Sequence, residues 1–178
     1  MVNFDYQTPT RLIFGRGVVS EKLASVMNQY GKRVLITYGG GSIKRTAPGH
    51  DKSLYDLVKD TLTDKQVFEL GGIQPNPKFN PSVLDGVRMC QDNDIDVILA
   101  VGGGSVLDCT KAIAGVAGTL KTKVTDNVEE AWDIVCGRKP TTAAVPIVDI
   151  ITMAATGSEY DMGGVISRTE TNDKLAYS

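Results

Sequence analysis

Histidine is almost missing from this sequence of 178 residues, which contains only His50. This residue stands in a loop beside Gly49, and we interpret it as a loop residue rather than a ligand. The Asp and Glu residues are spread over expected helix surfaces, so no cluster has the spacing of a metal site. No serine, histidine and acid are arranged as a catalytic triad. The residues alone therefore indicate neither a metal site nor an obvious acid or base.

Cysteine is also scarce, with three residues at wide spacing: Cys90, Cys109 and Cys136. An odd number at such spacing argues against a disulfide framework and against a zinc knuckle. Cys109 falls on an expected helix, on the side that faces the interior. We interpret it as a buried free thiol rather than a reactive group.

Strong charge and long apolar runs are lacking too. The formal net charge is −2, which gives no electrostatic case for binding nucleic acid or an acidic membrane surface. No apolar run approaches the length of a membrane span. The first residues, MVNFDYQTPTRL, show no basic stretch followed by an apolar one, so no signal peptide is expected and the expected location is the cytoplasm. The length fits one domain over residues 1–178.

What the sequence does contain is an alternation of expected strands and helices. The strands read as apolar on both faces, which is typical of a parallel sheet covered by helices. The sequence therefore predicts an α/β fold, Rossmann-like and doubly wound, with a mostly parallel sheet. The expected strands are Arg11–Phe14, Lys32–Thr37, Gln66–Leu70, Asp96–Val101 and Thr142–Val148, with a final hairpin of Gly163–Arg168 and Lys174–Tyr177. The expected helices are Val18–Tyr30, Asp51–Leu62, Ser105–Ala117 and Asn127–Val135. A further helix is expected to be capped by Asn80 or Ser82 and to run to about Asn93. Loops are expected at Tyr38–Gly49 and Gly71–Pro81.

The 19 glycines gather in clusters that follow apolar runs. In open α/β sheets, ligands bind beyond the carboxyl ends of the strands. Three glycine- or threonine-rich turns stand at such ends: residues 39–42, 102–105 and 152–159. We expect them to converge on one ligand.

The turn Gly102-Gly103-Gly104-Ser105 lies between an expected strand and an expected helix. Such a turn brings backbone N–H groups without side chains and a helix N-terminus to one point. This arrangement binds anions, and we expect a pyrophosphate there. Ser105 is expected to cap the helix or to donate to phosphate, and Asp108 to lie in its first turn. The spacing fits neither a P-loop nor the usual dinucleotide fingerprint, and a tight turn without a ligand is the alternative.

The turn Gly39-Gly40-Gly41-Ser42 continues into Lys44 and Arg45. NAD-specific sites place an acid near the end of a strand to bind the ribose hydroxyls, and this stretch has none. Small residues, a hydroxyl and two cations suit a 2′-phosphate and hence NADP. A flexible basic loop with solvated cations is the alternative. In the third turn, Thr152 and Thr156 offer hydroxyls and Gly157 permits close approach, which alone is weak evidence.

Four motifs together resemble the iron-containing alcohol dehydrogenase family, and within it the NADPH-dependent aldehyde reductases and butanol dehydrogenases. They are YGGGSIK from Tyr38, GGIQPNP from Gly71, GGGSVLDCTK from Gly102 and TGSE from Thr156, in order over nearly the whole chain.

The resemblance implies that this chain is a Rossmann-like N-terminal domain, that a C-terminal helical domain is absent, and that the chain ends before the family's metal ligands, an Asp and three His. A divalent metal, iron or zinc, is then expected only in the full-length protein. It also implies a small-molecule alcohol or aldehyde substrate and a homodimer. The cofactor-binding residues carried over by motif are Gly39, Gly40, Gly41, Ser42, Gly102, Gly103, Gly104, Ser105, Asp108, Thr152, Thr156 and Lys174. Asp108 and the neighbouring Lys111 are expected to serve mainly to set the turn.

Three hypotheses follow. The first is the cofactor-binding half of an NADP(H)- and metal-dependent alcohol dehydrogenase or aldehyde reductase, inactive as this chain alone. The second is a natural half-length module that binds nucleotide without catalysis. The third is a lyase of the dehydroquinate synthase type with bound NAD, against which the lack of an acid in residues 38–45 counts.

Overall fold

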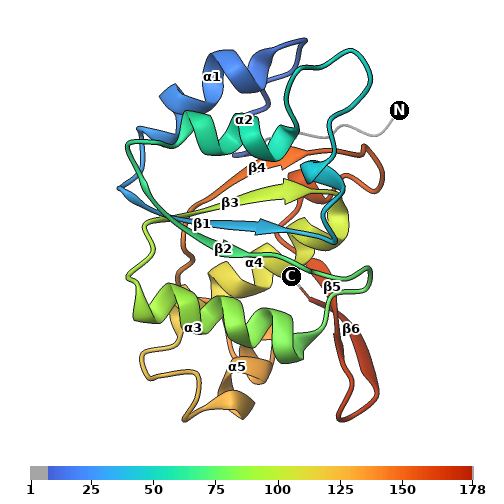
Figure 1. The fold of residues 1–178 in the computed structure, drawn as a ribbon. Coiled ribbons are helices and arrows are strands. Elements are labelled where there is room, and N and C mark those ends of the chain that lie inside the picture. Colours follow the sequence, from blue (N-terminus) through green and yellow to red (C-terminus); the bar gives the residue numbers. More distant parts are fainter. Residues whose placement is uncertain (1–7, 178) are drawn as a thin grey trace, which may run out of the picture.

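The computed structural model describes residues 8–177, in which helices and strands alternate along the chain (Figure 1). Residues 1–7, the start of the segment in which no signal peptide is expected, lie outside this range. In chain order the elements are α1 (Val18–Met27), β1 (Arg33–Tyr38), α2 (Leu54–Thr61), β2 (Gln66–Leu70), α3 (Leu84–Asp92), β3 (Val97–Gly102), α4 (Gly104–Thr119), α5 (Val128–Val135), β4 (Ile147–Ile151), β5 (Gly164–Arg168) and β6 (Asp173–Tyr177).

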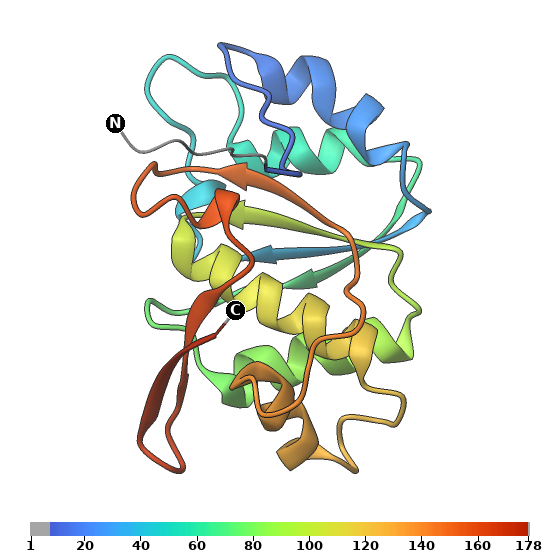
Figure 2. The ribbon, with the colours of Figure 1, turned by 180° about the vertical axis from the view of Figure 1, so that it is seen from behind.

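The main sheet has four parallel strands in the order β2-β1-β3-β4, so β1 and β3 are its central strands. Helices cover both faces, which confirms the predicted doubly wound α/β fold (Figure 1). The predicted terminal hairpin is confirmed as well: β5 and β6 pair antiparallel and form a separate two-stranded sheet (Figure 2).

The side chains of the central strands alternate between two hydrophobic cores. Val34 and Ile36 pack with Leu23 and Met27 of α1 and with Val58 of α2. On the other face, the residues between them pack against α3, α4 and α5; this core includes Leu35, Ile98, Ala100, Val87, Ile113 and Trp132. Because β1 and β3 are buried on both faces, the centres of both strands are continuously apolar.

A buried polar pair joins β1 to α4. The hydroxyl oxygens of Thr37 and Thr110 lie 2.6 Å apart, and both side chains are fully buried. The Thr110 hydroxyl donates its proton to the carbonyl oxygen of Val106. Thr37 is therefore the donor to Thr110, and the two hydroxyls are satisfied without water.

Two predictions about strands are wrong. Residues 11–14 form no strand; Leu12 and Phe14 are exposed, at 60% and 92%. The last strand is Ile147–Ile151 rather than Thr142–Val148, because the backbone of residues 142–145 instead bonds to Thr119 and Ala114 at the end of α4.

Neither Asn80 nor Ser82 caps α3. A wide π-helical turn, Phe79–Val83, leads directly into that helix, and the Asn80 amide donates to Glu170 instead. By contrast, the Ser53 hydroxyl accepts from the Asp56 backbone and caps α2. Within residues 8–177, every helix is too short or too polar to cross a bilayer.

Candidate dinucleotide site

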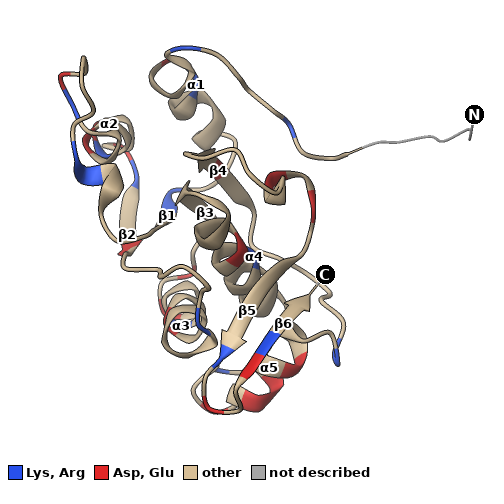
Figure 3. Ribbon diagram, turned by 90° about the vertical axis from the view of Figure 1, so that its right-hand side faces the viewer, with Lys and Arg blue, Asp and Glu red and all other residues tan. Residues whose placement is uncertain are grey.

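The turns that follow β1, β3 and β4 meet at one edge of the sheet, as predicted. Tyr38 is in register with Val101, and Gly102 with Ile151, so the three adjacent strands end level with one another. The Thr152 backbone then donates to the Gly102 carbonyl oxygen over 2.9 Å. Figure 3 looks along the sheet onto this side of the molecule, where β1, β3 and the start of α4 lie close together.

The Gly102–Ser105 turn combines one glycine that packing requires with one that faces open space. A β-carbon on Gly102 would lie 2.6 Å from the Val106 side chain, so only glycine fits there. A β-carbon on Gly104 would have no atom within 4 Å. Gly104 is the first residue of α4, and its neighbour Gly103 is the residue before the helix, with no side-chain cap. The N-terminus of α4 is thus uncovered by side chains and open to an anion.

Two predictions about this turn need correction. Ser105 does not cap α4, because the helix starts one residue earlier and Ser105 lies inside it. For the same reason Asp108 is in the second turn rather than the first. Its carboxylate accepts from the Ser158 hydroxyl at 2.7 Å and from the Val165 backbone at 2.9 Å. Asp108 therefore holds the turn after β4 and the start of β5 against α4.

Lys111 also holds the turn after β4 against α4. Its ammonium donates to the Ser158 carbonyl oxygen at 2.9 Å and to the Asp161 carboxylate at 2.7 Å. The Tyr177 hydroxyl donates to the Asp108 carbonyl oxygen at 2.5 Å, and burial raises the pKa of that hydroxyl. Helix α4 thus fixes both the third turn and the terminal hairpin through Asp108 and Lys111. The expectation that these two residues set the glycine turn of their own motif stays a prediction.

The Gly39–Ser42 turn is the more open of the two glycine turns. A β-carbon on Gly39 would lie 3.3 Å from the Ile73 carbonyl oxygen, whereas one on Gly40 or Gly41 would meet nothing within 4 Å. Gly41 has a φ of 96°, which favours glycine, and leads into a short helical turn of Ser42–Lys44. Ser42 is exposed, so its hydroxyl is available to a ligand.

The remaining predicted residues lie around this edge. Thr152 and Thr156 are exposed. Thr156 lines a hollow of about 470 Å³ together with Asp108, Ser158, Met162 and Tyr177. The Lys174 ammonium donates to the Asn76 side chain at 2.8 Å, which pairs it with the loop after β2. The role of each of these residues toward a cofactor stays a prediction.

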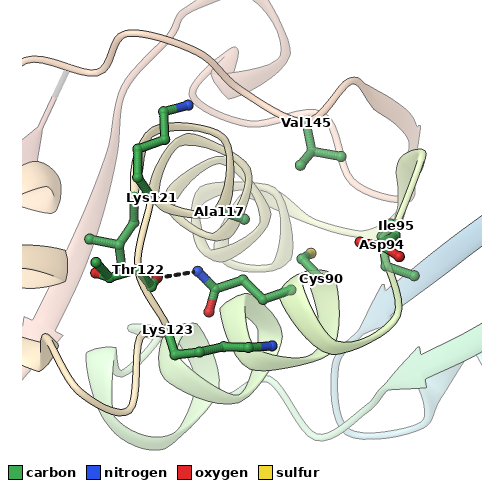
Figure 4. A pocket seen from close by; sticks show the side chains of 10 residues that line it. Cys90, Asp94, Ile95, Ala117, Lys121, Thr122, Lys123 and Val145 are labelled. Carbon is green, nitrogen blue, oxygen red and sulfur yellow. Dashed lines mark hydrogen bonds between the residues drawn. The ribbon is translucent and has the colours of Figure 1, made fainter.

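A second hollow, of about 360 Å³, lies at the opposite edge of the sheet (Figure 4). It is lined by the C-terminal ends of α3 and α4, including Cys90, Ala117 and Lys121. The glycine turns and the uncovered helix N-terminus are at the other edge. The hollow in Figure 4 is thus not part of the candidate site.

Asp149 on β4 is a charged residue that the sequence analysis passed over. One of its carboxylate oxygens is buried without a hydrogen-bond partner among residues 8–177. Burial raises the pKa of this carboxyl to about 6; Glu159 adds to the effect and Lys111 opposes it. Alternation along β4 puts its side chain on the α4 side with Ile147 and Ile151.

Residues 8–177 contain no group of three or more His, Cys, Asp and Glu residues placed to hold a metal ion. His50 is exposed in its loop. Burial raises the pKa of Cys90 and Cys109 to about 12, which fits the interpretation of Cys109 as a buried thiol. The described residues do not fit the metal that the resemblance implies.

Sequence reasoning missed a polar network beside the first glycine turn. Tyr38, Tyr55 and Lys59 all donate to the Glu69 carboxylate, and Lys44 lies over the two tyrosine rings. Tyr38 directly precedes Gly39, and Glu69 stands one residue from the end of β2. Their closeness follows from the pairing of β1 with β2, which a strand-by-strand interpretation does not give.

Comparison with known proteins places this geometry in context. The sequence model described as "Iron-containing alcohol dehydrogenase" matches residues 9–178. A Bacillus subtilis protein named "Probable NADH-dependent butanol dehydrogenase 1" is 46% identical over 99% of this chain and 42% of its own length. The NADPH-dependent aldehyde reductase YqhD of Escherichia coli is 40% identical over 99% of this chain and 42% of its length.

A solved structure of this family has the same fold as this chain. A Thermotoga maritima structure named as NADH-dependent butanol dehydrogenase A superposes with a TM-score of 0.84 at 33% identity, over 99% of this chain and 41% of that one. The chain therefore spans less than half the length of the relatives it matches. All the relatives named here are dehydrogenases or reductases, which gives no support to the lyase hypothesis.

Proposed function

Since the chain belongs to the iron-containing alcohol dehydrogenase family, we propose that it is the dinucleotide-binding part of an NADP(H)-dependent alcohol dehydrogenase or aldehyde reductase. Its relatives include both NADH- and NADPH-dependent enzymes, so the family supports a nicotinamide dinucleotide and leaves the choice between the two to the site itself.

One observation carries the proposal. Two glycine turns on adjacent central strands stand side by side, and Gly40, Gly41 and Gly104 all face space with no atom within 4 Å of a β-carbon position. A backbone surface of this kind lets phosphate oxygens approach N–H groups closely. A dinucleotide, with its phosphates and ribose rings in series, is long enough to contact both turns.

The residues proposed to hold the cofactor keep the assignments predicted from the sequence. Gly102, Gly103, Gly104 and Ser105 would hold the pyrophosphate at the start of α4. Gly39, Gly40, Gly41 and Ser42 would hold the adenosine ribose and its 2′-phosphate, and Thr152, Thr156 and Lys174 would make further contacts. Asp108 would act by positioning the turn that carries Thr156, through its bond to Ser158.

A bound nicotinamide supplies hydride for carbonyl reduction. The described residues contribute binding and orientation and bring no metal-binding group to this step. We therefore expect the 178-residue chain to bind NADP(H) without turning over an aldehyde.

Titration of the chain with NADPH, followed by nicotinamide fluorescence, tests the proposal. We expect saturable binding that Gly104→Ala weakens about tenfold, because the methyl group would enter the phosphate space. Gly115→Ala, farther along α4 with its nearest contact at 3.4 Å, is the matched control and should bind as the parent does. Absence of binding by the folded parent chain would refute the proposal.

Two further measurements address activity and assembly. Incubation with NADPH, butyraldehyde and added Fe²⁺ or Zn²⁺ should give no NADPH oxidation by this chain; clear turnover would contradict its assignment as the binding part alone. Multi-angle light scattering tests the predicted homodimer, for which the exposed Leu12 and Phe14 offer apolar surface near the N-terminus. A monomer at micromolar concentration would count against it.

A further inference from the structure

A lysine sits on an aromatic platform next to the first glycine turn. The Lys44 ammonium lies 4.5 Å from the centre of the Tyr55 ring and 4.8 Å from that of Tyr38. The two rings meet edge to face, with their centres 5.9 Å apart. Contact with ring faces holds a cation in place while leaving its N–H groups free for an anion.

The position of Lys44 is set by the turn itself. The Lys44 backbone donates to the Gly41 carbonyl oxygen, so the lysine is one tight helical turn beyond the open glycines. Its side chain is exposed, and its interaction with Tyr38 is the main reason that its pKa is raised above the usual value. Lys44 therefore remains charged at any physiological pH.

Beneath the platform, Glu69 is engaged by three donors. The Tyr38 hydroxyl lies 3.1 Å from one carboxylate oxygen, the Tyr55 hydroxyl 3.0 and 3.1 Å from the two oxygens, and the Lys59 ammonium 2.7 Å from one. Burial tends to raise the pKa of Glu69, but the bonds from Lys59 and Tyr55 outweigh it, and the pKa is lowered. Its oxygens are bound within the protein.

This arrangement matters for recognition of a ribose. A carboxylate at the end of a strand selects NAD when it accepts hydrogen bonds from the ribose hydroxyls, and it repels a 2′-phosphate. Glu69 is the acid nearest to such a position in this sheet, one residue before the end of β2. Tyr38, Tyr55 and Lys59 donate to this carboxylate, so its charge is compensated by Lys59 and most of its capacity to accept hydrogen bonds is already used.

We infer that Lys44, held on the rings of Tyr38 and Tyr55, is the residue that selects a phosphorylated adenosine ribose, and that this network also withholds Glu69 from the ribose hydroxyls. The inference rests on the proposed function and deepens it, because it names the side chains that decide between NADP and NAD. Tyr55 acts through Lys44 and is a positioning residue.

Calorimetric titration of the chain with NADP⁺ and with NAD⁺, at two salt concentrations, tests the inference. The parent chain should bind NADP⁺ more tightly. Lys44→Gln should lower this preference about tenfold, the value of one charge-assisted hydrogen bond, with little change in NAD⁺ affinity. The salt dependence of NADP⁺ binding should weaken in the same variant. Lys121→Gln, an exposed lysine beyond the far end of α4, is the matched control and should change neither affinity.

The platform is tested separately. Tyr55→Leu removes one ring and should lower the preference, whereas Tyr55→Phe keeps the ring and should retain most of it. A parent chain that prefers NAD⁺, or a Lys44→Gln variant with an unchanged preference, overturns the inference. Failure of the folded parent to bind either dinucleotide would instead refute the proposed function, so the two failures are distinguishable.

Discussion

The Ser158 hydroxyl donates a 2.7 Å hydrogen bond to the Asp108 carboxylate across 50 positions of sequence. The second carboxylate oxygen of Asp108 accepts from the Val165 backbone at the start of β5. One side chain on α4 thus fastens both the turn that carries Thr156 and the hairpin that carries Lys174. Asp108, carried over by motif as a cofactor-binding residue expected mainly to set the turn, thus makes its hydrogen bonds within the protein.

Asp108→Ala should therefore destabilise the protein by about 1–3 kcal/mol, because the Val165 N–H and the Ser158 hydroxyl lose their acceptor. Urea denaturation measures this change. Asp85→Ala is the control, because its partner Arg88 is largely exposed and the pair contributes less than about 0.5 kcal/mol. Equal losses in the two variants would contradict the anchoring role.

Gly102→Ala should mainly lower stability, whereas Gly104→Ala should mainly weaken dinucleotide binding. The first places a methyl group 2.6 Å from the Val106 side chain and should lower stability by about 1–3 kcal/mol. The second meets nothing within 4 Å and should keep stability while weakening dinucleotide binding. Thermal unfolding and NADPH titration of both variants separate the packing glycine from the binding one; a Gly104→Ala protein that unfolds more easily than the Gly102→Ala protein would refute this division.

Asp149→Asn should stabilise the protein at neutral pH. The pKa of Asp149 is about 6 in the folded state against 3.8 for the unfolded chain, so folding favours its protonated form. Stability from this group is greatest below about pH 4, falls as the pH rises toward 6, and stays low above it. The variant should gain about 1 kcal/mol at pH 8 and nothing at pH 3.5. Urea titrations of the variant and the parent at both pH values measure the difference in the free energy of unfolding. A variant that is more stable than the parent only at pH 3.5 would contradict the raised pKa of Asp149.

The thiols should react in a fixed order. Cys90 and Cys109 are buried, with pKa values of about 12, whereas Cys136 is partly exposed at the end of α5. A chromogenic disulfide reagent at pH 8 should modify one thiol per chain quickly and the other two only as the protein unfolds. The Cys136→Ser variant should lack the fast phase. Three equally fast thiols would disagree with the burial of α3 and α4.

The sheet could be predicted because its signals are local. The strands β1 and β3 have apolar centres, β2 is short and partly apolar, and glycine follows or ends each of them; the first two helices have apolar residues at helical spacing. Convergence of the glycine turns followed from the parallel arrangement alone. The misplaced last strand shows the limit of this reasoning. Thr142–Val145 is mostly apolar, which predicts a strand, yet its backbone bonds to Ala114 and Thr119 of α4, which a local pattern does not reveal.

The site could be predicted as a place but not as a set of contacts. Asp108 and Lys111 belong to the right segment, but their partners Ser158, Asp161 and Val165 are about 50 residues away. The Glu69 network likewise depends on the side-by-side position of β1 and β2. Interactions that close long stretches of chain leave little trace in residue spacing, so they become visible only in three dimensions.

The packing around the first glycine turn, residues 39–42, also determines which of its positions can accept a side chain. Residue 39 is confined by the Ile73 carbonyl oxygen at 3.3 Å, whereas residues 40 and 41 face open space, with a positive φ only at Gly41. Position 40 can therefore exchange side chains without disturbing either core, and position 41 can do so at the cost of backbone strain. Under the proposed function, substitutions at position 40 therefore offer a way to redesign cofactor preference without changing the scaffold.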